Sequence, residues 1–186
     1  VVPKRELNYI MGNPPFVGHQ WRTKEQAVDL ESVCKDIPKC GKLDYVCGWY
    51  VKAADYMQGT QIHAAFVSTN SISQGESVGI LWKPLFTEKR LTIEFAYRTF
   101  VWTSEAKDKA AVHCIIVGFT CGTAWNMCYL YESDRRRAVE HINGYLVDAP
   151  NVFIQSRGKP LTAGLPVMSK GSQPTDVGHL ILSESE

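Results

Sequence analysis

The stretch "YIMGNPPFVG", residues 9–18, places a short apolar run that favours a strand directly before Asn-Pro-Pro-Phe. Proline fixes its own φ and pushes the preceding residue toward extended backbone, so Asn13 stands at a rigid strand end. Pro14 and Pro15 have no amide hydrogens, which leaves carbonyl acceptors beside the Asn13 amide and the Phe16 ring. One interpretation is an ordinary turn. The other is a site for a flat ligand that carries an exocyclic amino group.

On both sides of this turn, the hydrophobic pattern predicts alternating strands and helices. The expected elements are strands at 7–11, 62–70, 91–102 and within 106–120, and helices at 23–37, 42–57 and 77–86, the last bent or ended near Pro84. A charged segment, residues 103–109, joins the last two strands as a hairpin. This order predicts half of a doubly wound α/β sheet with an antiparallel pair at its edge. Ligands of such sheets bind at the carboxyl ends of the strands, where Asn13 lies.

Composition excludes several classes of protein. A chain of 186 residues that is 45% hydrophobic suits one ordinary globular domain. The net charge of +1 gives no overall signal for nucleic acid, so a role in nucleic-acid binding needs a local patch. No apolar run reaches the ~20 residues of a membrane span, and the N-terminus lacks a signal-peptide pattern. We therefore expect a cytoplasmic protein with no membrane partner.

The six cysteines form no Cys-x-x-Cys pair. This spacing predicts no zinc site. Reduced thiols are expected because they are the default in a cytosolic chain of this length. His113 lies inside an apolar run, so we expect it to be a buried histidine with satisfied hydrogen bonds.

The character of the sequence changes at Asp148, where Pro, Gly and Ser become frequent. We expect a domain at residues 1–147 and an extended connector at 148–186. The chain opens directly into strand-like sequence without a methionine and closes just after another strand-like run. These ends predict an excised part of a larger polypeptide.

Further motifs follow the Asn-Pro-Pro-Phe stretch in a fixed order. They are Asp44-Tyr45 at a helix start, "FVSTNSI" at 66–72, "YRTFVW" at 97–102 and "EAKDKAAVHCIIVGF" at 105–119. In this order the chain, over roughly residues 7–186, resembles the amino-group, adenine-specific DNA methyltransferases. It is most similar to the methyltransferase part of the bifunctional type IIG/IIL restriction–modification enzymes. The resemblance implies the C-terminal half of a class I, Rossmann-like methyltransferase sheet with its edge hairpin, and a connector that leads into a target-recognition domain.

The resemblance also implies a reaction, namely methyl transfer from S-adenosylmethionine to the exocyclic amine of adenine in double-stranded DNA. It implies that Asn13 and Pro14 hold the amine, in a catalytic motif that includes Pro15, and that Phe16 stacks on a base flipped out of the duplex. Such a site works by positioning and electrostatics, without a covalent enzyme intermediate.

Other residues acquire expected roles from the same resemblance. Asp44 and Tyr45 line the cofactor's adenine pocket. The substrate-binding candidates are Phe100, Trp102, His19, Arg135, Arg136 and Arg137. Each has an alternative: Asp44 as a helix N-cap, Phe100 as a strand residue of the sheet, His19 as a structural histidine, and the arginine run as a solvated face.

The chain departs from the family pattern in one respect. No G-x-G occurs in it, whereas the family needs a glycine-rich turn and an acidic residue to hold the cofactor. We therefore expect half a cofactor site, completed by upstream segments of the polypeptide, and no activity for this chain alone. Two rival functions stay open: a non-catalytic DNA-binding module, and methylation of glutamine in proteins. Cytosine is a related substrate, for which the family usually places Ser where this chain has Asn13.

Overall fold

The computed structural model describes residues 3–102, 112–154 and 164. The chain divides into a first unit, Val1–Gln155, and a second unit, Ser156–Glu186. Residues 148–154, which the sequence assigns to the connector, belong to this first unit. No helix in the described ranges has the length and apolar character needed to cross a membrane.

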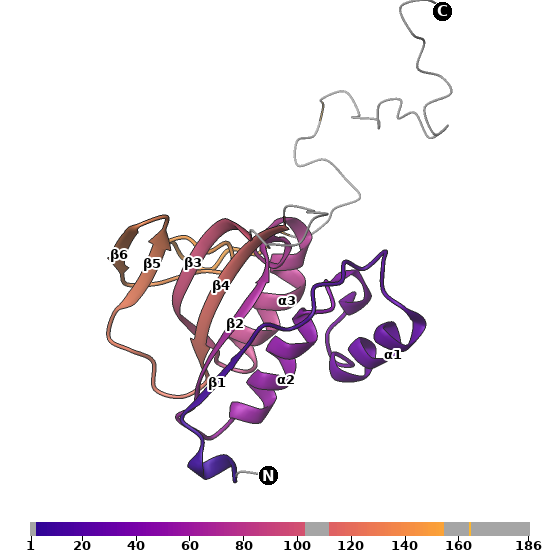
Figure 1. Cartoon of the computed structure of the whole chain (residues 1–186), viewed down its shortest axis with the longest axis horizontal. Coiled ribbons are helices and arrows are strands. Elements are labelled where there is room, and N and C mark those ends of the chain that lie inside the picture. The colour runs from indigo at the N-terminus through magenta and orange to yellow at the C-terminus, as the bar shows by residue number, and fades with distance from the viewer. Residues whose placement is uncertain (1–2, 103–111, 155–163, 165–186) are drawn as a thin grey trace, which may run out of the picture. The chain divides into compact units, whose positions relative to one another are not determined.

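The first unit is built on a mixed six-stranded sheet with the strand order β1-β2-β4-β3-β5-β6 (Figure 1). The strands are β1 (Tyr9–Gly12), β2 (His63–Thr69), β3 (Thr92–Trp102), β4 (Val112–Thr120), β5 (Cys128–Glu132) and β6 (Arg135–Val139). Pairs β1–β2 and β3–β5 are parallel, while β4 is antiparallel to both of its neighbours and β6 is antiparallel to β5. The α/β fold class expected from the sequence is confirmed.

The sequence predicts an antiparallel pair at the edge of the sheet, whereas the pair β3 and β4 lies inside it. Strand β4 lies inside the sheet, between β2 and β3, and β5 and β6 extend the sheet beyond β3. Strand β6 carries Arg135, Arg136 and Arg137 and forms an edge, where charged side chains disfavour pairing with other chains. The sequence did not predict β5 and β6, because an arginine run resembles a solvated surface more than a strand.

Helices α2 (Cys47–Met57) and α3 (Gly75–Thr87) cover one face of the sheet (Figure 1). Tyr50 of α2 is central to this core, since its ring contacts those of Phe66, Trp82 and Phe119 at centroid distances of 5.3, 5.4 and 5.3 Å. Its hydroxyl shares a hydrogen bond with Ser68 at 2.7 Å. Strand β2 alternates between buried and half-buried residues along its length.

Helix boundaries follow local chemistry only in part. Helix α1 (Lys24–Val33) begins with a capping box formed by Thr23 and Gln26. It ends before the predicted limit, and a short 3-10 helix, η2 (Cys40–Lys42), precedes α2. Helix α3 continues past Pro84. Two more 3-10 helices complete the fold, η1 (Lys4–Glu6) and η3 (Asn70–Ser73).

His113 is exposed, so the expectation of a buried histidine is wrong. It lies near the start of β4, opposite Val101, whose side chain is also exposed. After His113, strand β4 enters the core with Cys114, Ile115 and Val117.

Candidate active site

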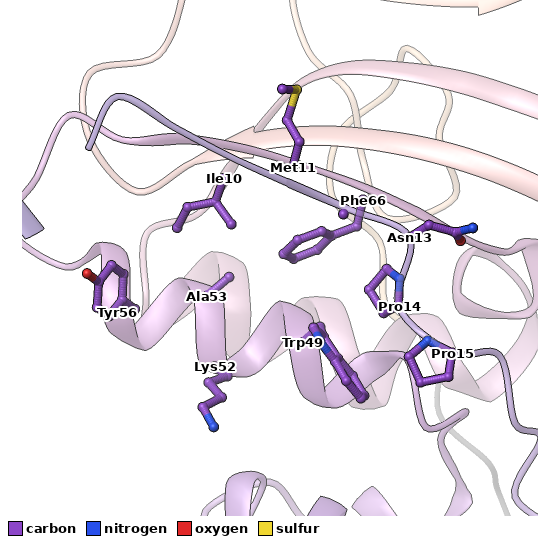
Figure 2. Close-up of a pocket in the computed structure, with 11 residues that line it drawn as sticks. Ile10, Met11, Asn13, Pro14, Pro15, Trp49, Lys52, Ala53, Tyr56 and Phe66 are labelled. Atoms are coloured by element: carbon purple, nitrogen blue, oxygen red, sulfur yellow. The ribbon is translucent and has the colours of Figure 1, made fainter. Parts of the chain in front are cut away.

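The Asn-Pro-Pro-Phe loop leaves the sheet at the carboxyl end of β1, as predicted. Gly12, the last residue of β1, pairs with Phe66 of β2. Asn13 follows with an exposed side chain that points away from α2 (Figure 2), whereas Pro14 is buried. The half-buried ring of Phe16 packs against the core. The loop is therefore anchored through Pro14 and Phe16 and presents the Asn13 amide to solvent.

A pocket of about 500 Å³ lies between this loop, β1 and α2. Figure 2 shows Ala53 and the ring of Trp49 on the α2 side, and Pro14 and Pro15 on the loop side. The complete lining is Ile10, Met11, Gly12, Asn13, Pro14, Pro15, Trp49, Lys52, Ala53, Tyr56 and Phe66. Most of these side chains are apolar, so the pocket suits a flat, weakly polar group.

Both carboxylate oxygens of Asp44 accept hydrogen bonds from other residues of the protein, one of them in the loop. Its Oδ1 accepts hydrogen bonds from the backbone N–H groups of Val17 and Val46, each at 3.2 Å. Its Oδ2 accepts a hydrogen bond from the Thr69 hydroxyl at 3.1 Å. The backbone N–H of Tyr45 donates a hydrogen bond to the Val17 carbonyl at 3.0 Å. The backbone N–H and the carbonyl of Val17 are therefore both hydrogen-bonded.

Tyr45 supports the pocket from outside it. Its ring meets that of Trp49 edge-to-face, with 5.0 Å between centroids. Its hydroxyl donates to Asp29 at 2.6 Å, and this hydrogen bond raises the pKa of the Tyr45 phenol above its usual value. Neither Asp44 nor Tyr45 lines the pocket, although both lie next to residues that form it. Trp49 does line it, and its one signal in the sequence is its position four residues after Tyr45 on a helix.

The remaining candidates do not gather at this site. His19 is exposed in the turn that links Gly18 and Trp21. Phe100 is half-buried on β3 and meets the Tyr97 ring edge-to-face at 5.5 Å. Trp102 ends β3, and its side chain lies outside the described part of the structure, as does the predicted hairpin.

The three arginines are exposed on β6, the edge strand opposite to β1 in the strand order. The Arg136 guanidinium lies 4.9 Å above the Tyr129 ring centroid, and Arg137 is 3.8 Å from Asp148. The structure therefore separates the arginine run from the Asn13 loop by the width of the sheet.

Glu94 and His63 form a polar cluster elsewhere in the sheet. The buried carboxylate of Glu94 contacts His63 Nδ1 at 2.7 Å and accepts from the Trp125 N–H at 3.0 Å. His63 pairs with Tyr9 at the amino end of β1, so this cluster is separate from the Asn13 loop. In the ranges that the structure describes, no group of three or more His, Cys, Asp or Glu is placed to hold a metal ion.

Comparisons with known proteins agree on one family. Residues 1–132 match the family described as the DNA-methyltransferase domain of MmeI. The chain is 39% identical over 179 residues to DNA methyltransferase A of Bacillus subtilis (strain 168), a match that covers 96% of this chain and 20% of that protein. It is also similar to the solved structure of the Type IIL restriction-modification enzyme MmeI in complex with DNA. That likeness has 42% identity and a TM-score of 0.87, and covers 94% of this chain and 24% of that one. The chain thus spans about a fifth to a quarter of these relatives.

Proposed function

This chain belongs to the family of the MmeI DNA-methyltransferase domain, and on that premise we propose that its Asn-Pro-Pro-Phe loop forms part of the catalytic site of a DNA methyltransferase. The proposed reaction transfers a methyl group from S-adenosylmethionine to the exocyclic amine of adenine in double-stranded DNA. The observation that carries the proposal is the exposed amide of Asn13, held on a rigid loop at the carboxyl end of a parallel strand. Open α/β sheets bind their ligands at this end.

The roles of the loop residues follow from their chemistry. The side-chain carbonyl of Asn13 and the backbone carbonyl of Pro14 accept the two N–H groups of the amine. Two acceptors on one amine orient its lone pair toward the incoming methyl group, and a buried Pro14 holds that geometry rigid. The amine is inaccessible inside a duplex, so the base leaves the stack and Phe16 replaces its lost stacking partner.

The pocket beside the loop fits part of S-adenosylmethionine. Trp49 and Pro15 present apolar surfaces suited to the adenine ring of the cofactor, and Tyr45 supports Trp49 from behind. When bound, the cofactor supplies the methyl group from its positively charged sulfur. The chain contains no G-x-G turn. We therefore propose that upstream segments of the same polypeptide complete the cofactor site, and that residues 1–186 alone do not methylate DNA.

DNA contacts extend beyond the loop in this proposal. Arg135, Arg136 and Arg137 present positive charge along an exposed edge strand and contact phosphates, which carry no sequence information. His19, Phe100 and Trp102 are proposed as further contacts to DNA. Residues 148–186 lead into a target-recognition region, and the reaction takes place in the cytoplasm as part of restriction–modification.

The test is methyl transfer by the native full-length protein, measured with labelled S-adenosylmethionine and a DNA library. The proposal expects N6-methyladenine as the product, identified by mass spectrometry. Asn13→Ala should lower the rate by about 10²–10³-fold, because it removes one preorganised group from the transition state. The matched control is Asn126→Ala, at an exposed loop position away from the pocket.

Other products would contradict the proposal and identify a rival. Methylated cytosine would change the substrate base, and methylated glutamine in a protein would change the substrate class. DNA binding without any S-adenosylmethionine binding would establish a non-catalytic module.

A further inference from the structure

Asp44 connects three segments that are far apart in the sequence, and one of them is the loop of the proposed site. We propose that Asp44 is a positioning residue for this loop and not a ligand of the cofactor, the role that the resemblance implies. The inference rests on the proposed function, because the loop it positions is the one assigned to methyl transfer.

The hydrogen bonds of Asp44 go beyond those of a helix cap. A local turn before α2 accounts for the bond from Val46, two residues ahead of Asp44. It does not account for the bonds from Val17 and Thr69, which lie 27 and 25 positions away. These two donors belong to the loop after β1 and to the end of β2. The Asp44 carboxylate therefore connects the loop after β1 to the start of α2 and to the end of β2. Its negative charge strengthens these hydrogen bonds.

Fixing Val17 fixes the direction of Asn13. The Val17 backbone is held at its N–H by Asp44 and at its carbonyl by the Tyr45 N–H. Between Val17 and Asn13 stand two prolines, whose rings restrict the intervening torsions. Gly12, on the other side of Asn13, is held by β2. The backbone is therefore fixed at Gly12 and at Val17, and the prolines between them restrict its path. Together they set the direction in which the Asn13 side chain leaves the loop.

The same geometry argues against direct cofactor binding by Asp44. Both carboxylate oxygens already accept hydrogen bonds from the protein, and Asp44 does not line the pocket beside the loop. A carboxylate that binds polar atoms of the cofactor's adenine needs a free oxygen that faces the pocket.

Four variants of the native full-length protein separate these roles. Asp44→Ala removes all three hydrogen bonds. Asp44→Asn keeps Oδ1 for both backbone donors, and its amide nitrogen can donate to the Thr69 hydroxyl. Thr69→Val removes the bond to Oδ2 together with the 2.6 Å hydrogen bond between the Thr69 and Ser71 hydroxyls, while Thr69→Ser restores a hydroxyl that can make both. Loss in the first variant and rescue in the second would show that the hydrogen-bond geometry, rather than the charge, is what the loop requires.

Two measurements are made on each variant. The first compares the single-turnover rate of methyl transfer with equilibrium binding of S-adenosylmethionine. Asp44→Ala should lower the rate by about 100-fold, as expected for a small misplacement of a reacting group, and leave the dissociation constant unchanged. The second is hydrogen exchange of the peptide that spans residues 13–20. Its amides should exchange faster in Asp44→Ala and at nearly the native rate in Asp44→Asn, with little change in other peptides.

Each outcome decides the inference. Weakened S-adenosylmethionine binding with native exchange at 13–20 would overturn it and make Asp44 a cofactor ligand. If Asp44→Ala unfolds globally, Thr69→Val decides, since faster exchange at 13–20 that Thr69→Ser reverses supports the inference, and native exchange overturns it. If the wild-type protein methylates no DNA, the proposed function fails. The exchange measurement then still establishes or excludes Asp44 as the residue that positions this loop.

Discussion

At the scale of single residues, Phe16 combines two duties that a substitution can separate. Its half-buried ring packs on the core and is proposed to stack on the flipped base. Phe16→Leu keeps an apolar side chain but loses the flat ring. We expect methyl transfer to fall by about 5- to 160-fold, which corresponds to the ~1–3 kcal/mol of base–aromatic stacking. Phe16→Tyr keeps the ring and should retain most of the rate.

The measurement for Phe16 is 2-aminopurine fluorescence at the target base, alongside the methylation rate. Phe86→Leu is the matched control, because Phe86 is a half-buried ring on α3 outside the pocket. Equal losses in the Phe16 and Phe86 variants would assign Phe16 to the core alone.

The sequence predicted the loop of the candidate site but not its supports. Asn13–Phe16 is recognisable because two adjacent prolines make the turn rigid without help from the rest of the fold. Asp44 is different, since its partners at Val17 and Thr69 come near it only after β1 pairs with β2. Trp49 was not predicted because its helical spacing is also that of a core residue.

At the scale of elements, β4 depends on a glycine. A Cβ at Gly118 would lie 2.0 Å from the Phe95 ring on β3, its partner in the register. Gly118→Ala should destabilise the fold by about 1–3 kcal/mol, as overpacking of a core does. Gly41→Ala is the control, since its Cβ would meet nothing closer than Glu31 Oε1 at 3.8 Å. Denaturant unfolding of both variants gives the comparison, and equal midpoints would contradict this account of β4.

The strands that the sequence failed to predict differ in burial, since β5 buries Cys128 and Leu130 whereas β6 is mostly exposed. Apolar periodicity identified β1 to β4, whose residues contact the core, and α2 and α3, which cover it. Strand β6 is exposed along Arg135, Arg136 and Arg137, so no apolar pattern marks it. The placement of β4 inside the sheet was not predictable either, because an antiparallel strand can pair on either side of its neighbour.

At the scale of the whole molecule, the thiols link stability to pH. Burial raises the pKa of Cys121 from its ordinary 9.0 to about 11, and burial also raises the pKa values of Cys34 and Cys47. Between pH 9 and 11 the unfolded chain therefore releases thiol protons that the folded chain keeps. The contribution of the protonated, buried thiols to the stability of the folded state is complete below pH 9 and is lost as the pH rises from 9 to 11.

We expect Tm to fall between pH 9 and 11 under reducing conditions, and to fall less steeply in Cys121→Ala. The Tm of both proteins is measured by thermal unfolding across this pH range. Lysines and tyrosines titrate in both proteins, so their effect cancels in the difference between the two Tm curves. Identical slopes would show that the Cys121 thiol titrates normally in the folded state.

The place of β4 in the strand order also governs how the nascent chain acquires its structure on the ribosome. Strands β2 and β3 touch β4 but not each other, so residues up to Trp102 supply two separate parts of a sheet. The gap between these parts closes only when Val112–Thr120 has been synthesised. Until then both β2 and β3 expose open edges, the condition in which a growing polypeptide is most prone to aggregate and most in need of a chaperone.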